Sequence, residues 1–139
     1  MPSRLRNDLN GLRVRLPGTD PIYLIDEGKR RYIDNPETYA ALFSTEEGVI
    51  EDIDIDEIPR GENIPKDAFL LRCQHQSNTP RENRMIFLID GVEPNQIKRH
   101  IVSPPVMDRY KFAWNQVQDW PVKLSAINYP DGNPIKNPP

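Results

Sequence analysis

The chain has 139 residues, which is enough for one compact domain built around one hydrophobic core. Charged residues make up 28% and apolar residues 37%, and the 15 prolines favour short helices and strands joined by many turns. The net charge of −3 has the wrong sign for a protein held by phosphate contacts, so we expect no nucleic-acid partner. We also expect no membrane partner, no secretory signal and no disulfide or zinc site, because no long apolar run is present and Cys73 is the one cysteine.

The first half of the chain predicts a strand and a hairpin. Residues 1–10 hold little apolar content and predict a flexible or docked lead-in. Leucine and valine alternate with arginine over residues 12–16, as in a half-buried strand. After a turn rich in proline and glycine, residues 22–26 and 29–33 are expected to form a hairpin that turns at Glu27-Gly28.

A short helix and an acidic strand are expected next. Asn35 offers a side-chain acceptor before Pro36 and Glu37, which is typical of a helix start and predicts one or two turns over residues 38–43. Isoleucine then alternates with aspartate over residues 49–58, which predicts a strand with one solvated acidic face.

The second half repeats this order with insertions. The predicted parts are a lead strand at 68–73, a polar connection at 74–84, a hairpin at 85–90 and 98–102 with an enlarged tip at 92–96, a short helix at 103–112 continued at 114–117, a closing segment at 129–135 that matches 58–64, and a frayed end at 136–139.

Two sequence segments carry this duplication. Tyr23-Leu24-Ile25-Asp26 is followed by a basic strand with Arg31, and Phe87-Leu88-Ile89-Asp90 is followed by one with Arg99. A lone hairpin is marginally stable in water, so each unit is expected to bury the apolar face of the other. We therefore predict a single α+β domain, mainly antiparallel, made of two strand, hairpin and short-helix repeats (about 12–64 and 68–135) related by approximate twofold pseudo-symmetry.

The repeated segments resemble a repeat of bacterial secreted and cell-wall-associated proteins. Its pattern is an aromatic-Leu-Ile-x-x-Gly-Lys-Arg-Arg hairpin, a Pro-x-x-Thr/aromatic-Phe helix and an Ile-Pro-x-Gly-x-Ile closing turn. Residues 23–31, 36–39 and 58–64 resemble it closely, and residues 87–91, 98–101, Pro104 and 130–135 resemble it with insertions. The resemblance implies a non-catalytic accessory module with an extracellular or cell-wall location.

An acidic run invites a calcium interpretation. Asp52, Asp54 and Asp56 stand at alternating positions, as at the start of an EF-hand loop. However, Glu57 occupies the sixth position in place of glycine, and Asn63 occupies the twelfth in place of glutamate. We expect no metal and no cofactor, and leave the three aspartates as candidates for a loosely held cation.

Arg31 and Arg99 recur in both copies, and two interpretations stay open for them. Each guanidinium pairs with Asp26 or Asp90 as a structural ion pair, or it contacts a ligand.

Aromatic residues gather in the second unit. Trp120 and Tyr129, with Asp119 nearby, could supply the apolar platform and the hydrogen-bond partner that a sugar needs. Trp114 is expected in the core instead.

No catalytic set stands out. His75 and His100 lie on different predicted elements, without a serine or cysteine in a nucleophile motif. We therefore predict a binding module rather than an enzyme, possible ligands being a glycan or cell-wall polymer. The alternatives are a protein-protein or self-association module, which includes a homodimer, and a small hydrolase.

Overall fold

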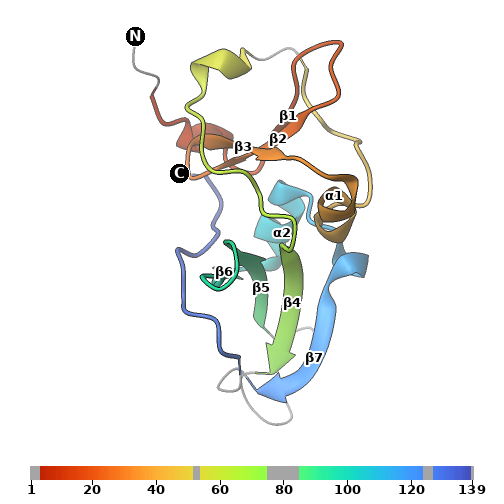
Figure 1. Ribbon diagram of the computed structural model, residues 1–139, viewed down its shortest axis with the longest axis vertical. Helices are drawn as coiled ribbons and strands as arrows, with labels where there is room; N and C mark the ends of the chain where they lie inside the picture. Colours follow the sequence, from red (N-terminus) through yellow and green to blue (C-terminus); the bar gives the residue numbers. More distant parts are fainter. Residues whose placement is uncertain (1–3, 52–53, 75–84, 124–126, 139) are drawn as a thin grey trace.

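The computed structural model describes residues 4–51, 54–74, 85–123 and 127–138, and its strands form two sheets (Figure 1). The first unit contributes η1 (Asn7–Leu9), β1 (Arg13–Val14), β2 (Ile22–Asp26), β3 (Lys29–Ile33), α1 (Pro36–Leu42) and η2 (Ile55–Glu57). The second contributes β4 (Phe69–Gln74), β5 (Met85–Asp90), β6 (Ile97–Ile101), α2 (Pro104–Tyr110), η4 (Trp114–Gln116) and β7 (Gln118–Lys123). The predicted α+β class is confirmed.

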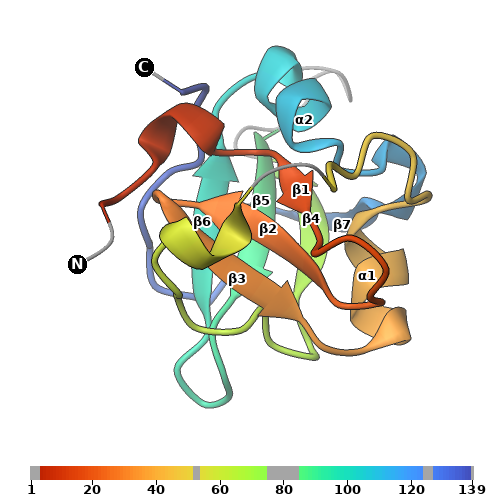
Figure 2. The ribbon, with the colours of Figure 1, turned by 90° about the horizontal axis from the view of Figure 1, so that it is seen from above.

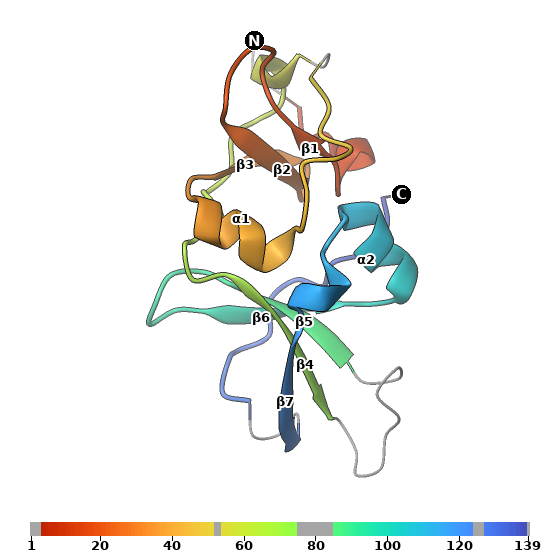
Figure 3. The same ribbon diagram turned by 90° about the vertical axis from the view of Figure 1, so that its right-hand side faces the viewer.

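The sheets have the orders β1-β2-β3 and β6-β5-β4-β7. Figure 3 shows the two sheets at opposite ends of the molecule, with α1 and α2 at the level where they meet. The three-stranded sheet is antiparallel, whereas the four-stranded sheet is mixed because β7 runs parallel to β4. Among the strands, the expectation of mainly antiparallel pairing therefore holds except at β7, which returns along β4. The isolated bridges outside the strands, such as Ile33 with Ile64 and Ile101 with Ile135, are also parallel.

Both predicted hairpins are present and pair in the same register. In each hairpin, the aromatic residue of the first strand stands three positions before the aspartate. The residue after the aromatic one pairs with the duplicated arginine on the second strand. The pairs are Tyr23–Tyr32 and Leu24–Arg31 in the first hairpin, and Phe87–His100 and Leu88–Arg99 in the second. This shared register places Arg31 and Arg99 on the same face as the apolar residues of the shared core.

Each hairpin also binds a closing segment through matching backbone hydrogen bonds. In the first unit, the Arg30 amide donates to the carbonyl of Pro59 at 2.8 Å, and Gly61 donates back to Arg30 at 2.9 Å. In the second unit, Lys98 donates to Pro130 at 2.8 Å and Gly132 donates to Lys98 at 2.9 Å. Each predicted closing segment thus pairs with the second strand of its own hairpin.

The first helix begins where the sequence predicts. The Asn35 side chain accepts a hydrogen bond from the Thr38 amide at 2.7 Å, and Pro36 occupies the first turn. The second helix starts after Ser103, whose side chain makes no capping hydrogen bond. It ends at Tyr110 because Lys111 adopts the left-handed conformation with a φ of 58°.

One apolar core is shared by both units. It contains Leu24 and Leu42 from the first unit and Leu70, Leu88 and Tyr110 from the second, all at most 2% exposed. Figure 2 looks along the axis that joins the sheets, with α1 and α2 on different sides of the molecule. Each sheet has a smaller cluster on its outer face, around Val14 and Ile25 in one case and around Leu71, Phe87 and Ile89 in the other.

The strand predicted over residues 12–16 is too long, and although Val14 is buried as expected, the exposure of Arg13 and the burial of Leu16 were predicted wrongly. Strand β1 covers two residues, Arg13 is 3% exposed and Leu16 is 48% exposed. The Arg13 guanidinium is buried because it donates to the Tyr39 hydroxyl at 2.6 Å and to the carbonyls of Thr45 and Glu47 at 2.7 and 2.5 Å. Hydrogen bonds to backbone oxygens, which are invisible in the sequence pattern, decide this orientation.

The continuous acidic strand over residues 49–58 is also wrong. Ile50 makes a single bridge to Val14, and the 3-10 turn η2 follows at Ile55–Glu57. Because Ile55 and Ile58 are three residues apart in this turn, both side chains reach the outer cluster of the first sheet.

Trp114 is exposed by 44% instead of lying in the core. Phe112 and Ala113 occupy the buried positions before η4, and the Trp114 indole donates to the Asp108 carboxylate at 3.2 Å. None of the helices in the described ranges has the length and apolar character that crossing a membrane requires.

Candidate functional site

Four charged residues meet between the two units. Arg31 donates to both oxygens of Asp90, at 2.7 and 2.8 Å, and Arg99 donates to both oxygens of Asp26, at 2.5 and 3.0 Å. Each arginine also contacts the aspartate of its own hairpin, at 2.9 Å for Arg31 and Asp26 and 3.3 Å for Arg99 and Asp90. We call these four residues the central ion network.

The closing segments hold both arginines in place. The Nε of Arg31 donates to the carbonyl of Glu62 at 2.9 Å, and the Nε of Arg99 donates to the carbonyl of Asn133 at the same distance. Each guanidinium therefore ties together its own hairpin, its own closing segment and the hairpin of the other unit. The sequence indicated the aspartate partners but not these carbonyl acceptors.

Electrostatics keeps Asp90 and Arg99 charged. Burial acts to raise the pKa of Asp90, but the hydrogen bonds and positive charges of Arg31 and Arg99 outweigh it and hold the pKa below its usual range. Burial acts to lower the pKa of Arg99, yet the aspartates raise it above the usual value. These contacts match the structural interpretation of Arg31 and Arg99, and their contact with a ligand stays a prediction.

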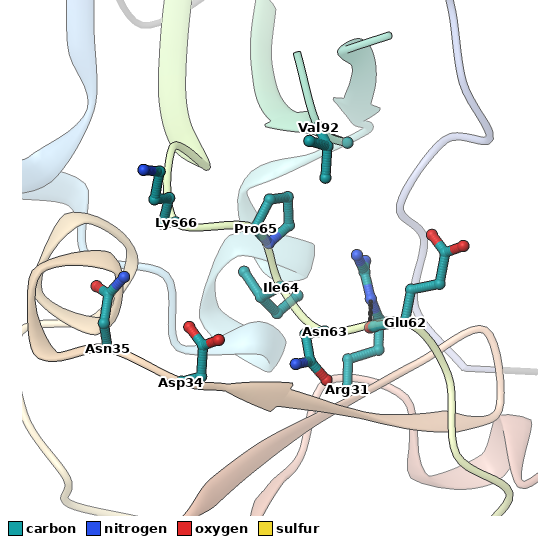
Figure 4. A pocket seen from close by; sticks show the side chains of 10 residues that line it. Arg31, Asp34, Asn35, Glu62, Asn63, Ile64, Pro65, Lys66 and Val92 are labelled. Atoms are coloured by element: carbon teal, nitrogen blue, oxygen red, sulfur yellow. Dashed lines mark hydrogen bonds between the residues drawn. The ribbon is translucent and has the colours of Figure 1, made fainter. Parts of the chain in front are cut away.

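A large hollow lies beside the network (Figure 4). Its volume is about 680 Å³, and it opens between the end of β3, the chain over residues 62–66 and the tip of the β5-β6 hairpin. Arg31 and Asn35 line it but are engaged by the network and by the helix cap. The remaining lining residues are Asp34, Glu62, Asn63, Ile64, Pro65, Lys66, Gly91 and Val92, so this hollow lacks an aromatic ring.

Aromatic side chains gather on the outer face of the four-stranded sheet. The rings of Phe69 and Trp120 stack with centroids 5.9 Å apart, and the Trp120 indole donates to the Gln118 side chain at 3.4 Å. Both side chains are half-buried, as are Met85 and Tyr129, which pack on the same apolar cluster. We call Phe69, Met85, Trp120 and Tyr129 the aromatic face.

Polar groups border the aromatic face. Lys98 donates to the carbonyl of Tyr129 at 2.6 Å and pairs with Asp131 at 2.9 Å. The His100 ring lies 5.4 Å from that of Phe87, and burial lowers the pKa of this imidazole, which keeps it neutral at pH 7. The strand alternation that puts Lys98 and His100 on the outer face turns Arg99 toward the other unit.

The predicted sugar-site residues fall into three places. Trp120 and Tyr129 come together on the aromatic face, whereas Arg31 and Arg99 lie in the central ion network. Asp119 lies on the opposite side of β7 from Trp120, where it pairs with Arg72 at 3.3 Å. Phe69 and Met85 were missed, although their alternation with buried positions in β4 and β5 could have indicated this face.

A metal site gains no support within the described ranges. No cluster of His, Cys, Asp and Glu suited to a metal ion occurs there, and Asp54 and Asp56 are exposed in and next to η2. Asp52 and His75 lie outside the described residues.

No protein-family model matches the chain, and no match is found among curated proteins or solved structures. The repeat resemblance therefore stays a prediction.

Proposed function

We propose that this chain is a non-catalytic module that binds a glycan on the aromatic face. The observation that carries the proposal is the stacked, half-buried pair Phe69 and Trp120, with Tyr129 on the same cluster. Half-buried rings fixed on a sheet offer an apolar platform for the CH face of a sugar ring. Lys98 and Gln118, on the same side, supply donors and acceptors for hydroxyl groups.

The sheet surface favours an extended polymer over a small enclosed ligand. Trp120 comes from β7 and Phe69 from β4, so the platform follows neighbouring strands instead of lining a deep pocket. Such a platform binds by contact with several sugar rings in succession, which is consistent with the predicted cell-wall polysaccharide.

Calorimetry with cell-wall polysaccharides and the variant Trp120→Ala tests this proposal. We expect the wild-type protein to bind at least one polysaccharide and Trp120→Ala to lose about tenfold or more in affinity, since stacked aromatic anchors dominate such surfaces. Trp114→Ala is the matched control, because Trp114 is an exposed tryptophan outside the aromatic face whose indole donates to Asp108, and this variant should bind normally. In a Trp114→Phe background, Trp120 is the remaining tryptophan, and its fluorescence should change on binding.

A partner protein is the second candidate, and one observation favours it. Within the described ranges β7 pairs with a single strand, β4, so the β7 edge of the sheet is open for another strand. Sedimentation at several protein concentrations tests self-association, and a homodimer would appear as a mass that rises with concentration.

We further propose that the two units are related by an approximate twofold rotation. Its support is the shared hairpin register, the matching closing segments and the reciprocal pairs of Arg31 with Asp90 and Arg99 with Asp26. The equivalent substitutions Asp26→Asn and Asp90→Asn should then lower stability by similar amounts.

A further inference from the structure

A second cavity, of about 580 Å³, opens on the side of the molecule where the two ends of the chain meet. Its walls come from three segments that are distant in sequence: the lead-in with Asn7 and Asn10, the β2-β3 turn with Glu27, and the tail with Asn133 and Lys136. The volume lies in the range of roughly 300–1,000 Å³ that is usual for small-ligand sites. It contains none of the four residues of the aromatic face.

Tyr110 lines this cavity with a hydroxyl that has no protein partner. The residue is 2% exposed, and its ring stacks on Phe112 in the shared core with centroids 5.4 Å apart. Among the described residues the Tyr110 hydroxyl makes no hydrogen bond, and its oxygen is not one of the fully buried atoms without a partner, which are the Nε atoms of Arg13 and Arg72, so it is open to the cavity. Burial, followed by the charge of Asp26, raises the pKa of Tyr110, so the hydroxyl keeps its proton and is a donor at every physiological pH.

The walls of the cavity are fixed by hydrogen bonds, so it exists before a ligand arrives. Gly28 donates to the Asn10 side chain at 2.7 Å, and Arg109 donates to the Asn10 carbonyl at 2.8 Å. Gly11, with a φ of 94°, lets the lead-in approach α2 closely, since a Cβ there would lie 2.9 Å from the Arg109 side chain. On the opposite wall, Asn133 donates to Glu27 at 2.9 Å.

The lining is polar but electrically balanced. Two carboxylates, Asp26 and Glu27, are matched by two cations, Arg99 and Lys136, and Arg99 contacts both carboxylates. The other polar groups are the side-chain amides of Asn7, Asn10, Asn133 and Asn137. An amide offers both donors and acceptors, and a ligand hydroxyl does the same, whereas a charged ligand would meet a like charge on one side.

We infer that this cavity is a binding site for a small, uncharged, polyhydroxylated ligand such as a monosaccharide, held by the asparagine amides and by the Tyr110 hydroxyl. Tyr110 is the buried donor that a ligand hydroxyl would satisfy. This site is separate from the aromatic face and does not depend on glycan binding there.

The test is a titration of isotope-labelled protein with glucose, galactose and N-acetylglucosamine at millimolar concentrations, followed by NMR. We expect at least one of these sugars to shift the amide signals of residues 7–11, 27–28 and 133–137. Tyr110→Phe removes one oxygen atom without altering the ring packing, and should bind that sugar about threefold to tenfold more weakly, as expected for one hydrogen bond. Its unfolding midpoint should equal or exceed that of the wild type, because the lost hydroxyl had no protein partner.

Three results would overturn the inference. They are the absence of shifts at these residues with all three sugars, equal affinity in Tyr110→Phe, and tighter binding of glucuronate or glucosamine than of the uncharged sugar. Trp120→Ala serves as the control, because it should leave this titration unchanged while weakening polysaccharide binding on the aromatic face. Each site can therefore fail independently of the other.

Discussion

The substitution Asp26→Asn should destabilise the fold strongly. The change keeps the shape of the side chain and removes its charge, so the Arg99 guanidinium loses its bidentate partner. The side chains of Asp26 and Arg99 are 3% and 4% exposed, so water cannot replace the lost carboxylate. Removing one partner of a buried pair costs about 3–5 kcal/mol, and the lower end, about 3 kcal/mol, applies here because Arg99 still contacts Asp90 at 3.3 Å and Glu27 at 3.5 Å.

That cost is a large part of the roughly 5–15 kcal/mol that stabilises a typical domain. With a urea m-value of about 1–3 kcal/mol/M, the unfolding midpoint should fall by roughly 1–3 M. Asp90→Asn should produce a similar loss, since Asp90 holds Arg31 in the same bidentate manner. Equilibrium urea unfolding followed by circular dichroism measures both changes.

A matched control and a second substitution sharpen this test. Asp8→Asn disrupts the exposed Arg6–Asp8 pair and should leave the midpoint unchanged. The double change Asp26→Leu with Arg99→Met should be less damaging than Asp26→Asn alone, because no buried charge is left unpaired. A midpoint for Asp26→Asn within error of the wild type would refute the assignment of the network as a principal contact between the units.

Two further predictions concern pH and helix capping. The pKa of Asp90 is lowered in the folded state, so its contribution to stability is complete above the unfolded pKa of about 3.9 and is lost as pH falls through the lower folded value. When urea unfolding midpoints are measured at decreasing pH, the midpoint of Asp90→Asn should therefore decline less steeply than that of the wild type. Parallel declines of the two midpoints would contradict this argument. Asn35→Ala should lower the free energy of unfolding by about 1 kcal/mol, because it removes the side chain that caps the Thr38 amide. Ser103→Ala, at a helix start without a capping hydrogen bond, should lower it much less. Equal decreases in the thermal unfolding temperature of the two variants would count against the capping argument.

Local signals in the sequence predicted most of the elements. The hairpins and the start of α1 follow from alternation, turn residues and an asparagine cap, all of which act over a few neighbouring residues. The pairing of Arg31 and Arg99 with Asp26 and Asp90 was also open to prediction, because the duplicated charges recur at fixed places in the two hairpins.

The errors came from interactions between distant segments. Arg13 is buried by the carbonyls of Thr45 and Glu47, and no alternation pattern reports a backbone acceptor more than thirty residues away. The cavity beside Tyr110 was missed for the same reason, because residues 7–10 and 133–137 meet only after folding. Trp114 was misplaced because its burial was expected from its large aromatic side chain alone, whereas Phe112 and Ala113 take the buried positions and leave Trp114 at the start of η4 exposed.

The reciprocal contacts between the units have a consequence for assembly. In the central ion network the arginine of each half pairs with the aspartate of the other half, so two chains that exchange halves would form the same pairs as one chain does alone. The short tether over residues 65–68 favours pairing within one chain, because it keeps the two halves at a high effective concentration. A higher protein concentration, or a stiffer tether, would shift the equilibrium from pairing within one chain toward an intertwined dimer.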